Sequence, residues 1–299
     1  MSTSPDRIRH AVALRLLSVV FVATMSATIK LAEARGAHFA EIIFFRQAAA
    51  LPLVTAWIAA GPGLTSVRTR RIGAHVTRTI VGMTGMVCLF GSLLLLPLAE
   101  ATTFQFTVPI FATILGVVLL KEPTGWHRWS AVLAGFVGVV IVARPGTGHI
   151  ALGGAAFGLG AATAAATVSI LLRQIGKTEG AATTVFWFTS LSVPPLGLLY
   201  AFHFAAHPPI VWAMLVGIGL IGGAGQLALT GALKLGPVSV VVPMDYSSLL
   251  WATLYGWLLF DVLPGTTTWI GAPIIIGSGL YIVWREHVRH RVETEQAIA

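Results

Sequence analysis

Apolar residues in this chain gather into ten stretches, each close to the length of one bilayer crossing, with short polar connections between them. The expected spans are 12–31, 39–60, 74–96, 100–120, 126–143, 152–173, 181–203, 209–233, 237–260 and 267–285. A hydrocarbon core about 30 Å thick needs about 20 mostly apolar residues for each helical crossing. The pattern therefore predicts an all-α integral membrane protein with ten transmembrane helices.

The basic residues fall on every second connection, and this sets the expected orientation. With the N-terminus in the cytoplasm, Lys30, Arg35 and Arg144 lie on the outer side and Arg46 lies within a span. The other fifteen of the 19 lysines and arginines are then cytoplasmic. Cytoplasmic loops carry such an excess of positive charge. We therefore expect both termini in the cytoplasm and a multi-pass protein of the cell inner membrane, surrounded by membrane lipid.

Composition and motifs narrow the possible functions. Hydrophobic residues make up 56% of the 299 residues and charged residues 10%, and the mean hydropathy is +0.85. The net charge of +8 belongs to residues that flank apolar segments, so we expect no nucleic-acid partner. The sequence has no P-loop, HExxH motif or nucleophile elbow, which excludes an ATP-driven pump and leaves an intramembrane enzyme without a catalytic set. We expect no cofactor and no metal.

The chain also contains an internal repeat. Residues 119–144 read LLKEPTGWHRWSAVLAGFVGVVIVAR, and residues 258–285 read LLFDVLPGTTTWIGAPIIIGSGLYIVWR. Ten helices then divide into repeats at 1–146 and 147–299, and the repeats are inverted because five is an odd number. Inverted repeats place a binding site near the midplane, and rocking of the two halves gives alternating access. Gene duplication without a transport role is the alternative.

Several runs of this sequence resemble the EamA family of the drug/metabolite transporter superfamily. They are PLAEATTFQFTVPIFATILGVVLLKEP (97–123), RWSAVLAGFVGVVIVARPG (128–146), PMDYSSLLWATLYGWLLFDVLP (243–264) and FFRQAAALP (44–52). The resemblance implies ten helices, with helices 1–4 and 6–9 around a central cavity and helices 5 and 10 at the periphery. It also implies small-molecule transport, with riboflavin, amino acids and S-adenosylmethionine among the family's cargoes.

Two charged residues inside predicted spans are the first candidates for a site. Asp245 lies about eight residues, or ~12 Å, into the ninth helix, and Arg46 about seven residues, or ~10 Å, into the second. Asp245 is either a substrate ligand or proton-coupling carboxylate, or a structural or hydrated group. Arg46 either pairs with Asp245 across the repeats or extends outward to the interface. Lys30 and Glu100, at outer helix ends, are interpreted as interfacial anchors.

Uncharged polar and aromatic residues complete the candidate set. Gln105 and Gln226 lie in helices that the resemblance places at the cavity, where an amide can bind cargo without the cost of a charge. Aromatic rings nearby would suit a flat or partly apolar cargo, although lipid-facing bulk is the alternative for any one of them. The candidate substrate-binding residues are Asp245, Arg46, Gln105, Gln226, Tyr246, Trp251 and Phe104.

These features together predict a secondary active transporter that moves a small organic metabolite by alternating access. Aromatic content and the range of the family favour riboflavin or a similar flat heterocycle. An amino-acid or other metabolite exporter and an S-adenosylmethionine-type carrier are the alternatives within the fold. An intramembrane enzyme and a channel are the alternatives from other classes. The sequence leaves the direction, proton coupling and the choice between monomer and homodimer open.

Overall fold

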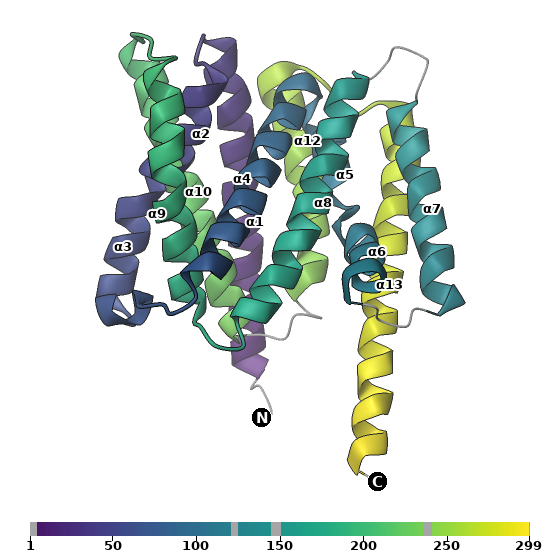
Figure 1. Cartoon of the computed structure of the whole chain (residues 1–299). Coiled ribbons are helices and arrows are strands. Elements are labelled where there is room, and N and C mark those ends of the chain that lie inside the picture. Colours follow the sequence, from purple (N-terminus) through teal and green to yellow (C-terminus); the bar gives the residue numbers. More distant parts are fainter. Residues whose placement is uncertain (1–4, 121–124, 145–150, 236–240, 299) are drawn as a thin grey trace.

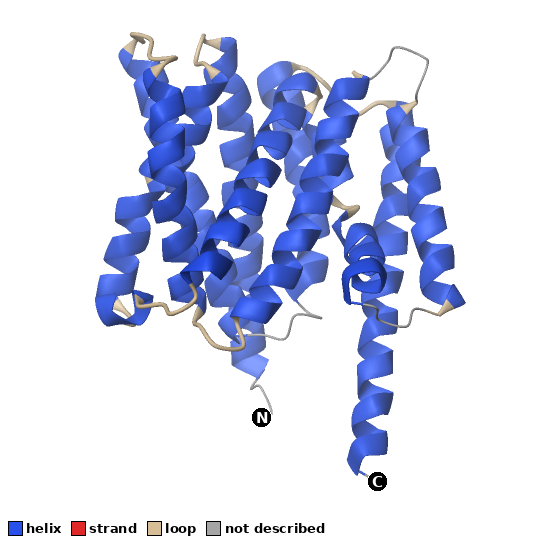
Figure 2. Cartoon of the chain, viewed as in Figure 1, coloured by secondary structure: helices blue, strands red, loops and turns tan. Residues whose placement is uncertain are grey.

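The computed structural model describes residues 5–120, 125–144, 151–235 and 241–298, which form helices and turns without any strand (Figure 2). Within these residues, eight helices are long and apolar enough to cross a membrane. Each of the eight overlaps one predicted span, so the all-α membrane class is confirmed. The other two predicted spans, 126–143 and 237–260, contain a shorter apolar helix and a broken segment that begins outside the described residues.

The helices follow the order of the predicted spans, and three of the spans are interrupted. The elements are α1 (Pro5–Ala34), α2 (Phe39–Ala48), α3 (Ala50–Ala60), η1 (Leu64–Val67), α4 (Ile72–Leu95), α5 (Leu98–Gln105), α6 (Val108–Leu120), α7 (Trp126–Ala143), α8 (Leu152–Ile175), α9 (Ala181–Ala201), α10 (Pro209–Leu235), η2 (Val242–Ser247), α12 (Ser248–Phe260) and α13 (Thr266–Ile298). The first helix begins and the last helix ends at the same end of the bundle (Figure 1).

Prolines account for two of the interruptions. Pro52 and Pro109 lack the N–H that would bond the carbonyls of Ala48 and Gln105, so the ladder fails between α2 and α3 and between α5 and α6. Next to the second break, the Thr107 hydroxyl donates instead to the Phe104 carbonyl at 2.6 Å. Irregular backbone at membrane depth is tolerated where protein or a cavity surrounds it. The breaks therefore indicate where a site can form.

The most extensive contacts join the first half of the chain to the second. α1 packs along α10, α4 along α8 and α7 along α13 (Figure 1). α1 and α8 hold the same place in the two repeats, and so do α4 and α10. The α1–α10 contact and the α4–α8 contact are therefore equivalent. The α7–α13 pair stands at one edge of the bundle, and the closeness of its helices requires Gly271, where an added Cβ would lie 2.5 Å from Val142.

A glutamate and a histidine join the two halves at each end of the bundle. At one end, Glu41 of α2 lies 2.7 Å from His207 Nε2, in the turn before α10. At the other end, Glu179, in the turn before α9, binds His75 of α4 and the Thr69 hydroxyl. The two pairs are equivalent in the two repeats, because α2 corresponds to α9 and α4 corresponds to α10. We call them the Glu41–His207 clamp and the Glu179–His75 clamp.

The two predicted interfacial anchors join helices as well. Lys30 of α1 donates to the carbonyls of Leu93 and Leu96 at 2.9 and 2.6 Å, which places its charge at the C-terminal end of α4. That position is favourable because the last carbonyls of a helix carry partial negative charge. Glu100 accepts from the backbone N–H of Gly265 at 3.2 Å and from Thr268 at 3.1 Å, at the N-terminal end of α13.

The Glu179–His75 clamp should make stability depend on pH. Burial opposes ionisation of Glu179, but hydrogen bonds from Thr69 and His75 outweigh it and lower the pKa of this carboxyl below its ordinary value. Glu179→Gln should therefore reduce the free energy of unfolding by about 1–3 kcal/mol at neutral pH. Because the folded-state pKa is the lower one, the carboxylate stabilises the fold above the unfolded-state pKa, and this contribution disappears as pH falls through the folded-state pKa.

Thermal unfolding of the full chain in detergent measures this effect. The difference between wild type and Glu179→Gln should shrink below about pH 4. Glu33→Gln, at an exposed position at the end of α1, is the matched control and should change stability little at either pH. A Glu179→Gln deficit that stays constant across this range would contradict the assignment.

Candidate functional site

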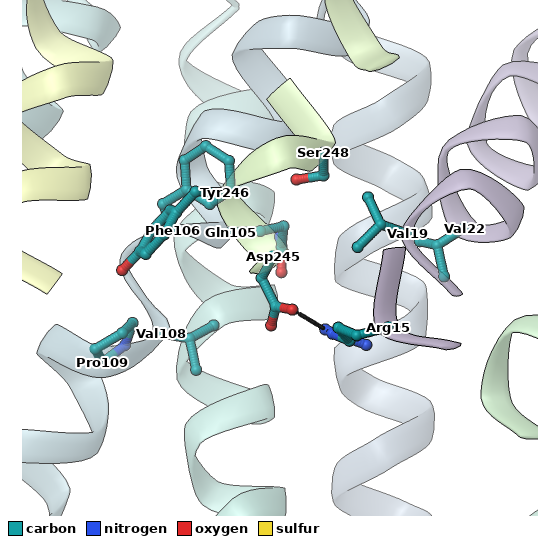
Figure 3. Close-up of a pocket in the computed structure, with 10 residues that line it drawn as sticks. All are labelled: Arg15, Val19, Val22, Gln105, Phe106, Val108, Pro109, Asp245, Tyr246 and Ser248. Carbon is teal, nitrogen blue, oxygen red and sulfur yellow. Dashed lines mark hydrogen bonds and ion pairs between the residues drawn. The ribbon is translucent and has the colours of Figure 1, made fainter. Parts of the chain in front are cut away.

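The first cavity lies between α1, the α5–α6 break and η2, and its volume is about 260 Å³ (Figure 3). It contains one carboxylate, one guanidinium and one amide among mostly apolar neighbours. Its lining residues are Arg15, Val19, Val22, Gln105, Phe106, Val108, Pro109, Asp245, Tyr246 and Ser248. Residues from both halves of the chain therefore enclose one space.

Asp245 pairs with Arg15 in this cavity and not with Arg46. The Arg15 Nε and Nη2 both contact Asp245 Oδ1, and the two side chains point toward each other from α1 and η2 (Figure 3). Arg15 Nη1 also donates to Ser18 at 3.4 Å. The predicted Arg46–Asp245 pair is therefore wrong. Arg15 reaches Asp245 because α1 begins at Pro5, which places this arginine well inside a helix that packs against η2.

Aromatic residues contribute one wall of the first cavity. The rings of Tyr246 and Phe106 meet edge to face with centroids 5.1 Å apart. The Tyr246 hydroxyl points away from Asp245 (Figure 3) and lies against Gly279, where an added Cβ would be 2.4 Å from this oxygen. The ring of Tyr246 therefore faces the cavity, while its hydroxyl has no hydrogen-bond partner among the described residues.

Two predicted aromatic residues line neither cavity. Phe104 is fully buried and packs on α8, where an added Cβ at Gly158 would lie 2.8 Å from the Phe104 Cβ. Trp251 lies beside Tyr255 on α12, with ring centroids 6.2 Å apart, and is absent from the described linings of both cavities. Phe104 thus fills the contact between α5 and α8, and this explains why its ring is not available to a cargo.

A second cavity, of about 220 Å³, lies between α2, α4, α5, α8 and α9. Its polar lining residues are Arg46, Gln47, Arg78 and Gln105. Apolar or small residues complete it: Met25, Gly82, Gly85, Met86, Leu89, Phe90, Ala161, Ala164, Ala165, Val168 and Phe188. Gln226 lines a smaller adjacent space together with Arg46, Gln47 and Arg78. Gln105 lines both main cavities, so its side chain lies between them.

The sequence located part of this arrangement and missed part of it. Asp245, Arg46 and Gln105, which it singled out, line a cavity, whereas it counted Arg15 and Arg78 as cytoplasmic charges that only orient the chain. The positions of Arg15 and Arg78 in the sequence could have identified them, since each lies several residues inside a long helix. The described residues of α7 and α13 line neither cavity, in agreement with the peripheral positions that the family resemblance implied.

The chemistry of the two cavities is that of binding a small molecule. A carboxylate–guanidinium pair and two further guanidiniums face walls that are otherwise apolar. Such convergent polar groups within apolar walls are typical of ligand sites. Within the described residues, no group of three His, Cys, Asp or Glu side chains could hold a metal ion.

Comparison with known proteins agrees with a transport site. The chain is 30% identical over 231 residues to a riboflavin transporter of Vibrio cholerae, covering 76% of this chain and 77% of that one. It is 29% identical over 230 residues to a riboflavin transporter of Rhizobium johnstonii, covering 77% and 76%. It is 27% identical over 256 residues to an S-adenosylmethionine uptake transporter of Rickettsia bellii, covering 83% and 85%.

Fold and family comparisons extend over nearly the whole chain. A crystal structure with 19% sequence identity superposes with a TM-score of 0.58 over 91% of this chain and 95% of that chain, which shows a shared fold. The model of the EamA-like transporter family matches residues 10–144 and, a second time, residues 152–284. The chain therefore belongs to the EamA-like transporter family.

Proposed function

We propose that this protein is a secondary active transporter that carries a small organic metabolite across the bacterial inner membrane by alternating access. We assign it ten transmembrane helices in two inverted repeats, 1–146 and 147–299, with both termini in the cytoplasm. The observation that carries the proposal is the first cavity, to which one family copy contributes Gln105 and the other Asp245. Inverted-repeat carriers place their sites at such a junction between copies.

Riboflavin or a similar flat heterocycle is our first choice of cargo. Two relatives are riboflavin transporters, and the rings of Phe106 and Tyr246 offer an apolar wall beside hydrogen-bonding groups. An S-adenosylmethionine-type cargo is the second choice because of the similar carrier in Rickettsia bellii. One chain encloses both cavities, so we take the monomer as the unit of transport.

The Arg15–Asp245 pair is the proposed link to proton coupling. It joins α1 of the first family copy to η2 of the second. Protonation of Asp245 would remove the charge that holds Arg15, and α1 could then move relative to η2. A proton gradient would act on the transporter through this release.

Transport by purified protein in proteoliposomes tests the function. With labelled riboflavin and labelled S-adenosylmethionine offered separately, we expect saturable uptake of one of them and exchange against the same unlabelled compound inside. Carriers show both properties because each cargo molecule requires one conformational cycle. Unsaturable flux would indicate a channel, and product formation without translocation would indicate an enzyme; either result would contradict the proposal.

Neutralising the Arg15–Asp245 pair tests its role. Arg15→Gln or Asp245→Asn alone leaves one unpaired charge at the cavity and should lower stability by about 1–3 kcal/mol, less than a fully buried pair would lose, because 38% of the Asp245 side chain is exposed. The double variant should recover protein level and thermal stability. If Asp245 couples protons, the double variant should also lose the response of uptake to an imposed pH gradient; an unchanged response would remove that role.

A further inference from the structure

Two arginines face the second cavity without an acidic partner. Among the described residues, Arg46 makes no hydrogen bond or ion pair, and the buried Nε and Nη1 of Arg78 are unpartnered. The Arg78 guanidinium lies over the Phe188 ring, 3.7 Å from its centroid. No Asp or Glu is present in the described lining of this cavity. The second cavity therefore carries net positive charge, whereas Asp245 balances Arg15 in the first.

A buried amide with open hydrogen-bonding capacity lies beside these two guanidiniums. Gln47 is 1% exposed, and both of its side-chain polar atoms lack a partner among the described residues. Arg78 is only 8% exposed. Buried polar groups in folded proteins nearly always have partners, because leaving one unpaired costs free energy. Three neighbouring side chains with open capacity indicate a place where a ligand completes the bonding.

Glycines provide the space that both guanidiniums occupy. An added Cβ at Gly222 of α10 would lie 2.6 Å from Arg46 Nε, and one at Gly82 of α4 would lie 3.1 Å from Arg78 Nη1. These glycines are at matching positions, because residues 82–97 (GMTGMVCLFGSLLLLP) and 222–237 (GGAGQLALTGALKLGP) align with three shared glycines and a final proline. Arg46 approaches its glycine from α2, whereas Arg78 lies four residues before Gly82 on α4 itself, with the Phe188 ring of α9 also close to Gly82.

The chemistry of these groups defines their complement. A guanidinium donates hydrogen bonds and accepts none, and its planar fork matches carboxylate and phosphate oxygens. An unpaired cation at this depth is costly unless an anion or water reaches it. We propose that the second cavity is an anion-recognition site in which Arg46 and Arg78 bind a carboxylate or phosphate group of the cargo, with Gln47 as an additional hydrogen-bonding group. This site favours S-adenosylmethionine or a phosphorylated flat heterocycle over riboflavin itself, which has neither group. The inference rests on the proposed function only in taking the ligand to be the cargo.

Matched ligand pairs test the site by binding, independently of transport. The full-length protein in a neutral detergent, free of lipid headgroups, is titrated with riboflavin and with riboflavin 5′-phosphate. It is then titrated with S-adenosylmethionine and with its decarboxylated form. In at least one pair the member that bears the phosphate or carboxylate, here called the anionic member for that group, should bind about tenfold more tightly or better, because a charge-assisted hydrogen bond contributes that much. A preference in the first pair identifies phosphate, and one in the second identifies carboxylate.

The same titrations separate this inference from the proposed function. Binding of the anionic member without uptake in proteoliposomes would support the site and contradict transport of that compound. Saturable uptake of riboflavin with no preference for the anionic member of either pair would support transport and overturn the site. The wild-type comparison decides between these outcomes even where a variant fails to fold.

Arginine variants locate the effect. Arg46→Gln and Arg78→Gln should each reduce binding of the preferred ligand that bears the phosphate or carboxylate about tenfold, and leave binding of its counterpart without that group within about twofold. Arg35→Gln, an exposed arginine at the outer end of α1, should change neither. Equal losses for both members of the pair would assign both arginines a structural role and overturn the proposal.

A pair of glycine variants tests the same site without changing any charge. Gly222→Ala places a methyl group 2.6 Å from Arg46 Nε and equally close to Met25 Sδ, while Gly217→Ala on the same helix meets no atom within 4 Å. Gly222→Ala should displace the guanidinium and weaken binding of the anionic ligand about tenfold, and Gly217→Ala should bind like wild type. An unaffected Gly222→Ala variant would show that the position of Arg46 does not govern binding.

Discussion

A charge within the hydrocarbon layer costs several kcal/mol unless a partner, a helix end or water stabilises it, and this cost explains where the charged side chains of the bundle lie. Arg15 and Asp245 neutralise each other across α1 and η2. Lys30 is held by the last carbonyls of α4. Each of these solutions joins two helices, so the protein uses its own charges to fix their packing. Arg46 is the contrasting case, because the cavity beside it supplies no anion.

The two cavities differ in charge, and this difference bears on how a cargo would bind. The first cavity is close to neutral and has an aromatic wall, while the second is cationic and has a mostly aliphatic and glycine wall. Gln105 lines both, so a molecule that crosses it exchanges one environment for the other. A cargo with a flat ring and a polar end would find complementary groups on both sides of this residue.

The sequence predicted the helices well because bilayer thickness dictates their length, and hydropathy records that length directly. The irregular backbone near Asp245 has a cause that the sequence shows, because Pro243 lies in the first turn of η2. The sequence could not predict that Arg15 is the partner of Asp245, since the positive-inside count treats any basic residue near a helix end as a loop charge. Phe104 failed as a candidate for a related reason: whether a ring faces a cavity or a neighbour depends on a small residue, here Gly158, far away in the chain.

The contacts between the two family copies constrain how the transporter can move. α1 lies along α10 and α4 along α8, and the Glu41–His207 and Glu179–His75 clamps join the copies at opposite ends of the bundle. Neither copy is a packing unit in its own right, so the repeat seen in the sequence does not coincide with a rigid body. Rotation of one copy against the other would break the largest interfaces in the molecule. These contacts argue against the rocking of the two sequence halves that the repeat alone suggested, and they favour moving groups that each combine helices from both copies.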